Sequence, residues 1–125
     1  MKRTIATDKA PKAVGPYSQA IEAGDVLYVS GQLPIDPADG LMPDSVEAQA
    51  EQVLKNVGAI LAAAGYGFGD VVKSTVLLAD MAYFDAVNAV YARFYSEPLP
   101  ARVCYQVAKL PKDAKIEIET IAVKK

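Results

Sequence analysis

The sequence contains no histidine and only one cysteine among its 125 residues. Without histidine, neither a Ser-His-Asp nor a Cys-His system for nucleophilic catalysis is possible, and a histidine-rich zinc or iron site is excluded as well. If the protein is an enzyme, proton transfer must fall to carboxylates, tyrosine, lysine, cysteine or bound water. A single cysteine allows no disulfide within the chain and no cysteine cluster for zinc, which is typical of a reducing compartment. We therefore expect no metal site.

Excess charge and long apolar runs are also missing. The formal net charge is −2 at pH 7, which provides no basic surface for a phosphate backbone, so nucleic acid is not an expected partner. No apolar stretch is long enough to span a bilayer, and no apolar run follows the basic start of the chain. The length and the 52% hydrophobic composition suit one ordinary domain. We expect a soluble, cytoplasmic protein with a single domain over residues 1–125 and no membrane partner.

A glycine-rich phosphate loop is absent too. The segment 65–69 has three glycines, but it follows an expected helix rather than a strand and lacks the Lys-Ser/Thr ending of a P-loop. We interpret it as the end of a helix and a turn, with Gly65 closing the helix.

Apolar periodicity predicts a hairpin followed by a first helix. Residues 17–21 and 26–30 are expected to pair around the turn at Gly24. Asp44 would cap the helix, with Glu47 three residues later completing a capping box. The apolar stripe of this helix consists of Val46, Ala50, Val53, Leu54, Val57, Ile60, Leu61 and Ala64.

A central strand is predicted over residues 71–79, which are rich in branched side chains. Asp80 would cap a second helix that ends before Pro98, with an apolar stripe of Phe84, Val87, Tyr91 and Phe94 or Tyr95. The order of strands, helix, strand, helix and two strands favours an α+β domain with a mixed or antiparallel sheet and two helices on one face. Because the other face is too apolar for full exposure, we expect self-association, or else an N-terminal segment folded over that face.

The last two strands carry charges among apolar residues. Period-two alternation separates each strand into two faces. One face holds Val103, Tyr105, Val107, Ile116 and Ile118, and the opposite face holds Arg102, Cys104, Gln106, Glu117 and Glu119. We predict that the first set faces the core and that the charges share the faces directed away from it.

Several motifs, together covering essentially the whole chain, resemble the Rid family, also called the YjgF-like family, and most closely its RidA-type imine deaminases. They are Gly15-Pro16-Tyr17-Ser18-Gln19-Ala20, Ser30-Gly31-Gln32-Leu33-Pro34, Asp70-Val71-Val72-Lys73-Ser74-Thr75-Val76, Val87-Asn88, and the block from Pro100-Ala101-Arg102 through Leu110-Pro111 to Ile116-Glu117-Ile118-Glu119. The resemblance implies a chorismate-mutase-like α+β fold and a homotrimer whose sheets form a central barrel, with ligand sites in clefts between neighbouring subunits. The implied activity is the cofactor-independent hydrolysis of reactive 2-imino and 2-enamino acids, such as 2-aminoacrylate and 2-iminobutanoate, to 2-oxo acids and ammonia.

The resemblance also implies roles for individual residues. Arg102 matches the arginine that would clamp the substrate carboxylate, because a guanidinium can donate two parallel charge-assisted hydrogen bonds to it. Glu117 matches the acidic residue that holds the attacking water, with Glu119 as the lesser alternative. The structural alternative is that Arg102 merely pairs with one of these glutamates across the strands.

Four further residues are candidates for the substrate pocket. Tyr17 matches a pocket tyrosine whose hydroxyl can donate to substrate or water, and Gly31 a glycine whose backbone approaches the ligand. Asn88 could bind ligand or bond locally. Cys104 is expected to form part of the pocket wall as a small buried thiol rather than to act as a nucleophile.

Two other functions remain open. Some relatives are described as endoribonucleases that inhibit translation, but an acidic, histidine-free chain lacks a basic track for RNA and the usual acid–base pair. The third is a non-enzymatic trimer that binds small carboxylates in the same clefts or acts as a chaperone.

Overall fold

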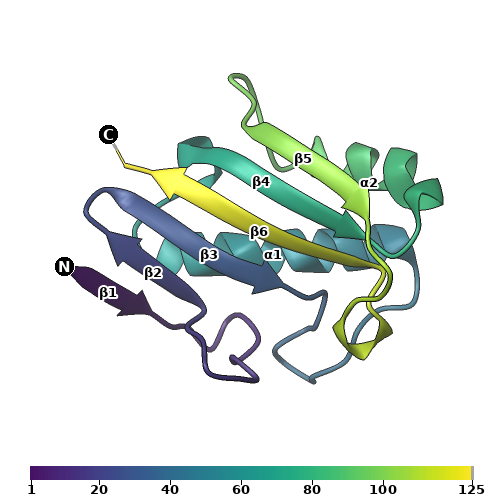
Figure 1. The fold of residues 1–125 in the computed structure, drawn as a ribbon, viewed down its shortest axis with the longest axis horizontal. Coiled ribbons are helices and arrows are strands. Elements are labelled where there is room, and N and C mark those ends of the chain that lie inside the picture. Colours follow the sequence, from purple (N-terminus) through teal and green to yellow (C-terminus); the bar gives the residue numbers. More distant parts are fainter. Residues whose placement is uncertain (125) are drawn as a thin grey trace.

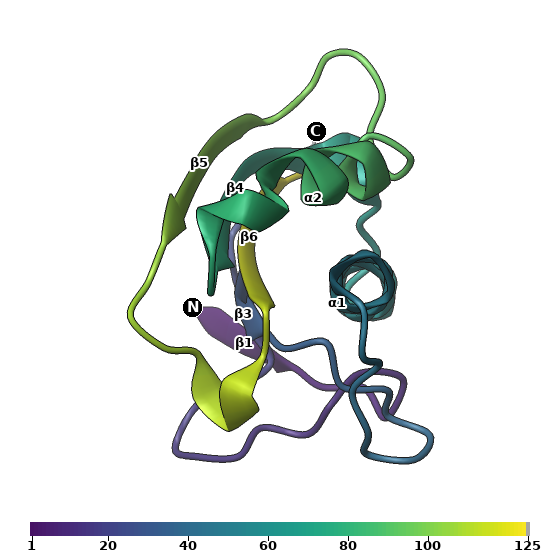
Figure 2. The same ribbon diagram turned by 90° about the vertical axis from the view of Figure 1, so that its right-hand side faces the viewer.

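The fold, seen in a computed structural model that describes residues 1–124, is one six-stranded sheet with two helices packed on one face (Figure 1). The strands lie in the order β1-β2-β3-β6-β4-β5. Their bounds are β1 Lys2–Ile5, β2 Ala20–Ala23, β3 Val26–Gln32, β4 Val71–Leu78, β5 Ala101–Gln106 and β6 Ile116–Val123, and the helices are α1 Val46–Ala63 and α2 Phe84–Tyr91. β4 and β5 are parallel and the other pairs are antiparallel. Figure 2 shows both helices on the same side of the sheet, so the predicted α+β architecture with a mixed sheet is confirmed.

The first helix confirms the predicted stripe but not its predicted cap. Ser45, in extended backbone, is the N-cap, and its hydroxyl accepts a hydrogen bond of 3.1 Å from the amide of Ala48. The prediction of Asp44 was wrong by one residue, because the first helical hydrogen bond runs from the amide of Gln49 to the carbonyl of Ser45. Gly65 ends the helix with a φ of +83°, as predicted.

Two short 3-10 turns follow Gly65, the predicted end of the first helix, and Asp80, the predicted cap of the second. A 3-10 turn at Phe68–Asp70 follows Gly65, so this glycine-rich segment is a helix end and turn. Asp80 accepts a hydrogen bond of 2.8 Å from Ala82, but it caps the 3-10 turn Met81–Tyr83 rather than α2 itself. The predicted hairpin is formed by β2 and β3, although β2 begins at Ala20 instead of residue 17.

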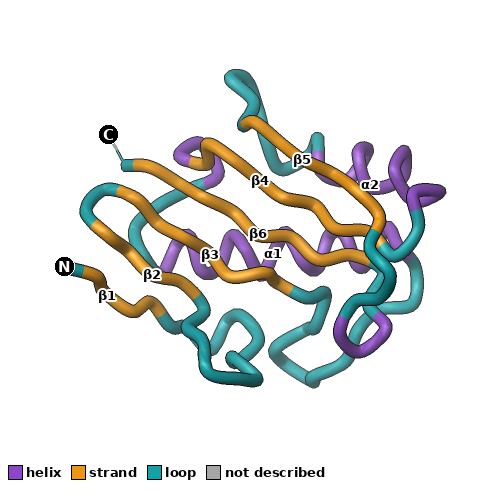
Figure 3. The backbone as a smooth tube through the Cα atoms, viewed as in Figure 1, coloured by secondary structure: helices purple, strands orange, loops and turns teal. Residues whose placement is uncertain are grey.

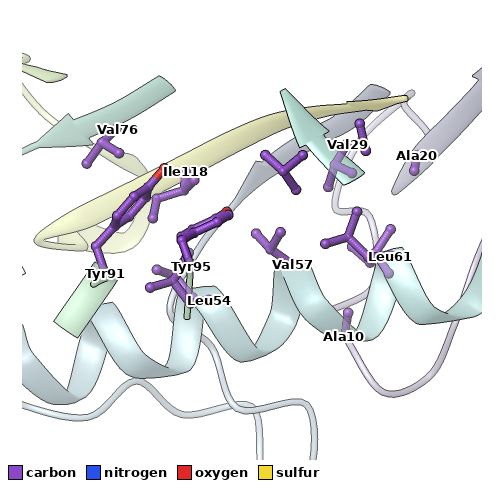
Figure 4. Packing of buried hydrophobic residues seen from close by; sticks show 14 of the residues in the cluster. Ala10, Ala20, Val29, Leu54, Val57, Leu61, Val76, Tyr91, Tyr95 and Ile118 are labelled. Atoms are coloured by element: carbon purple, nitrogen blue, oxygen red, sulfur yellow. The ribbon is translucent and has the colours of Figure 1, made fainter. Parts of the chain in front are cut away.

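The core lies between the helices and the covered face of the sheet (Figure 4). Leu54, Val57 and Leu61 of α1 point toward Val29 and Ile118 of the sheet, and all five are at most 4% exposed. Burying a side chain of this size stabilises the folded state by about 1.5–3 kcal/mol. The apolar stripe of α1 therefore packs against the sheet and fixes which strand residues face inward.

The two charged strands do not form a hairpin with each other. β4 lies between them, because it pairs in parallel with β5 and antiparallel with β6 (Figure 3). A third segment therefore separates two strands that are adjacent in the sequence. The connection between them contains another 3-10 turn, Pro111–Asp113.

The register reverses the predicted facing of β5. Ser74 of β4 lies opposite both Arg102 and Thr120, and Ser74 and Thr120 are buried on the helix-covered face. Leu77 lies opposite Tyr105 and Glu117, which face the open side. Arg102 and Cys104 therefore lie on the covered face, while Val103 and Tyr105 are 41% and 49% exposed on the open one. The prediction that the charges share one face was wrong, because alternation does not tell which face a neighbouring helix covers.

The open face of the sheet is rich in apolar side chains. Register places Ile21, Tyr28, Leu77, Val103, Tyr105 and Ile121 on it. Residues 2–5 extend the edge of the sheet as β1, so the start of the chain does not fold over this face. Within residues 1–124, no helix combines the length and the apolar character needed to cross a membrane.

The cap of α1 provides a test of the fold. Replacing Ser45 by alanine removes the acceptor for the Ala48 amide and is expected to lower the free energy of unfolding by about 1 kcal/mol. The matched variant Asp44→Ala is expected to change it by less than about 0.5 kcal/mol. Urea unfolding at one protein concentration measures both, and an equal loss in the two variants would contradict the assignment of Ser45.

Candidate active site

A cleft of about 430 Å³ brings together three of the predicted site residues, Tyr17, Gly31 and Glu117, with Glu119. Its walls come from the loop before β2, the end of β3 with the segment after it, and the start of β6. Leu33 and Ile35 line it as apolar wall residues that sequence reasoning did not assign. Leu33 lies within the motif that contains Gly31, and Ile35 directly follows this motif, which was the only available signal.

Gly31 and Glu117 are in close contact across neighbouring strands. A Cβ atom built on Gly31 would collide with the Glu117 carboxylate and would lie 3.0 Å from its Cδ atom. The contact falls where the register between β3 and β6 shifts, between Val29 and Gln32. The backbone of Gly31 therefore approaches Glu117 closely, and any larger residue would displace this side chain. The approach of Gly31 to a ligand stays a prediction.

Glu117 has a raised pKa. The first cause is desolvation of its half-buried carboxyl, and the second is repulsion by the neighbouring carboxylate of Glu119. A carboxyl whose pKa is moved upward exchanges protons with water more readily near neutral pH than an exposed glutamate. Glu117 is therefore the residue of this cleft best suited to accept and return a proton.

Tyr17 is carried by a loop that one buried side chain organises. The amide of Gln19 donates to the carbonyls of Thr7, Ala10 and Pro11 at 3.0, 3.3 and 2.8 Å, and its oxygen accepts from the Thr7 amide at 2.7 Å. The tyrosine hydroxyl accepts a hydrogen bond of 3.3 Å from the Val14 amide, and its ring is 47% exposed. Sequence analysis placed Gln19 in the motif of residues 15–20 but predicted no role for its side chain.

Ser30 fastens this loop to the sheet. Its hydroxyl donates to the Ser18 carbonyl at 2.6 Å, and its amide donates to the Gln19 carbonyl at 2.9 Å. The loop that carries Tyr17 is thereby tied to the residue that precedes Gly31. Tyr17 and Gly31 therefore take their relative positions from a shared set of hydrogen bonds.

Arg102 lies away from this cleft, on the helix-covered face of the edge strand β5. Its guanidinium carbon is 4.9 Å from the centre of the Tyr91 ring and 5.7 Å from that of Phe84. Among the ion pairs within residues 1–124, none includes Arg102. The alternative in which Arg102 pairs with Glu117 or Glu119 is wrong for this chain, since both glutamates lie on the opposite face.

Asn88 and Cys104 lie with Arg102 rather than with the cleft. Asn88 follows Phe84 by four residues and precedes Tyr91 by three, which places it on the same side of α2 as the rings that contact Arg102. Desolvation raises the pKa of the Cys104 thiol, and the positive charge of Arg102 offsets this only in part. The thiol is therefore protonated at neutral pH, which agrees with a wall residue and not with a nucleophile.

The candidate residues thus form two separate groups within one chain. Tyr17, Gly31 and Glu117 line the cleft, whereas Arg102, Asn88 and Cys104 gather at α2 and β5. The pleat of the sheet separates the groups, because Arg102 and Glu117 point to opposite faces. A substrate that needs both groups cannot bind to one isolated chain.

The loop carrying Tyr17 can be tested through Gln19. In Gln19→Leu, the amide of Thr7 loses its acceptor, and hydrogen exchange at Thr7 is expected to accelerate at least about tenfold, since an unpaired buried group costs about 1–3 kcal/mol. The matched variant Gln52→Leu removes a side-chain bond to Asn56 on α1 and should leave exchange at Thr7 unchanged. Equal exchange at Thr7 in wild type and Gln19→Leu would show that the loop is held by other contacts.

Comparison with known proteins gives a consistent match over the whole chain. Residues 7–124 match the family model described as Endoribonuclease L-PSP. A 2-iminobutanoate/2-iminopropanoate deaminase of Salmonella typhimurium is 51% identical over 128 residues, with 100% of both chains covered. RidA from the Antarctic bacterium Psychrobacter superposes with a TM-score of 0.95 at 49% identity, covering 98% of this chain and 99% of that one. E. coli TdcF with bound serine has a TM-score of 0.95 at 45% identity, with the same coverage.

Proposed function

The chain belongs to the Endoribonuclease L-PSP family as a RidA-type member, and on that premise we propose that it hydrolyses 2-imino acids to 2-oxo acids and ammonia. The observation that supports this most directly is the 51% identity over the full length to a deaminase of 2-iminobutanoate and 2-iminopropanoate. The cleft supports it chemically, because a carboxyl of raised pKa and a tyrosine both line it. No cofactor is required for this reaction.

In the proposed reaction, Glu117 accepts a proton from water as the water oxygen adds to the imine carbon. This proton is then passed to nitrogen, which gives a carbinolamine. The proton of its hydroxyl group also moves to nitrogen as the C–N bond breaks, the C=O bond of the 2-oxo acid forms and ammonia leaves. One imine and one water yield one 2-oxo acid and one ammonia, so no oxidant or reductant is needed. A 2-enamino acid first tautomerises to the imine and then follows the same path.

Arg102 is the proposed clamp for the substrate carboxylate. It has no carboxylate partner among residues 1–124, so its edge donors are available for a substrate. Because Arg102 and Glu117 lie on opposite faces of one sheet, we infer that Arg102 of one subunit and Glu117 of its neighbour complete each site. The apolar open face, with Tyr28 and Tyr105 about half exposed, supports a trimer in which three sheets pack around a central axis.

The clamp is tested by supplying the imine with a serine or threonine dehydratase and following 2-oxo acid formation above the spontaneous rate. Arg102→Ala is expected to lower kcat/KM about ten- to a hundredfold, because one charged partner of the carboxylate is lost. The matched control is Arg93→Ala, whose guanidinium only pairs with Glu51 at the surface at 3.1 Å. No acceleration by the wild type, or equal rates for wild type and Arg102→Ala, would contradict the proposal.

The shared site makes a second, sharper prediction. Arg102→Ala is expected to keep at most about a tenth of the wild-type activity and Glu117→Ala to be at least as impaired. Subunits of the two variants refolded together at equal amounts should nevertheless regain about a quarter of the wild-type activity. That fraction follows from random mixing in a cyclic trimer, where one site in four combines an intact Arg102 with an intact Glu117. If both residues served one site within a single subunit, mixing would restore nothing.

The same measurements separate the two other functions. An endoribonuclease would cut RNA in a manner that Arg102→Ala or Glu117→Ala abolishes, although the net charge of −2 provides no attraction for a phosphate backbone. A non-enzymatic binder would take up 2-oxo acids saturably without accelerating hydrolysis of any imine.

A further inference from the structure

The guanidinium of Arg102 contacts two aromatic rings and forms no ion pair with a carboxylate among residues 1–124. Its central carbon lies 4.9 Å from the ring centre of Tyr91 and 5.7 Å from that of Phe84, both within the range of a cation–π interaction. These two residues are seven positions apart in α2, so they lie two turns apart on the same side of the helix. Together they form a surface of two rings, which we call the aromatic shelf.

The aromatic shelf is itself held in place by packing. Tyr91 stacks on Tyr95 with ring centres 4.5 Å apart, and Tyr95 packs edge-on against Phe68 at 5.2 Å. Tyr91 and Tyr95 are each only 8% exposed, and Figure 4 shows their rings between α1 and the sheet. Because the Tyr91 ring is enclosed in this way, its side-chain rotation is restricted and the same ring face stays in contact with Arg102.

The hydroxyl of Tyr91 does not serve Arg102. It points toward the sheet, where it is buried without a hydrogen-bond partner among residues 1–124 (Figure 4). The hydroxyls of Tyr95, Ser74 and Thr120 are also buried without a hydrogen-bond partner among residues 1–124. Only the ring face of Tyr91 is therefore in contact with the guanidinium, and phenylalanine would retain that face.

We propose that Tyr91 and Phe84 are positioning residues that hold the guanidinium of Arg102 in the orientation that receives the substrate carboxylate. A guanidinium stacks through its face and donates hydrogen bonds from its edge, so the rings restrict its motion without occupying its donors. The positioning role rests on the proposed function, in which Arg102 is the clamp. It adds that the strength of the clamp depends on two rings that contact the face of the guanidinium.

The test compares Tyr91→Leu, which removes the ring, with Tyr91→Phe, which retains it. Tyr91→Leu is expected to raise KM for the imine by about 2- to 30-fold, the range of a cation–π contact, with a smaller change in kcat. Tyr91→Phe should stay within about twofold of the wild type. The matched control is Tyr66→Leu, because Tyr66 is equally buried, and its ring also carries a cation, Lys124, at 4.7 Å. It should leave KM unchanged even if it lowers stability.

A double-mutant cycle separates positioning from general damage to the fold. In the Arg102→Ala background, Tyr91→Leu should have no further effect on the binding of 2-oxobutanoate, measured by calorimetry, because there is no guanidinium left to hold. If Tyr91→Leu does not assemble, Phe84→Leu tests the same shelf at a less buried ring and should raise KM in the same direction.

The possible failures are distinct. If the wild type does not accelerate imine hydrolysis, the proposed function fails. If the wild type is active and Arg102→Ala is impaired, but the leucine variants keep the wild-type KM or act additively with Arg102→Ala, the positioning role is overturned.

Discussion

The alternation of side chains across the pleated sheet is the constraint on which the rest of the structure depends. Buried residues such as Val76 and Ile118 face the helices, and their burial sets the register of the central strands. Once that register is set, every second side chain is assigned to one face. The same packing that stabilises the fold therefore places Arg102 on the covered face and Glu117 on the open one. A slip of β6 by one residue would move Glu117 to the covered face, at the cost of exposing Ile116 and Ile118.

The placement of Arg102 and Glu117 on opposite faces of the sheet is related to a second feature of the chain, its exposed apolar sheet face. The cleft holds a carboxyl of raised pKa and the edge strand holds a cation, and the two point to opposite faces of the sheet within one chain. The open face, meanwhile, leaves apolar side chains such as Tyr105 half exposed. Association of copies through that face would bury these side chains and join the two groups in one event. Assembly and activity would then have the same physical origin.

Neither Glu117 nor Arg102 has an oppositely charged partner among residues 1–124. Glu117 is half-buried and close to a second carboxylate, conditions that disfavour its charged form. Arg102 stands beside aromatic rings without a counter-ion among residues 1–124. Groups in such surroundings are frequent at functional sites, because a ligand supplies the missing partner.

The sequence by itself determined the local features: the stripe and glycine end of α1, the β2–β3 hairpin, the α+β class, and the exclusion of histidine chemistry. These depend on periodicity and on residue types within a few positions. Only the tertiary structure decided that β4 enters between β5 and β6, that Arg102 faces α2, and that Gly31 meets Glu117. Period-two alternation reports that a strand has two faces, but which of them is covered depends on contacts between residues far apart in the chain.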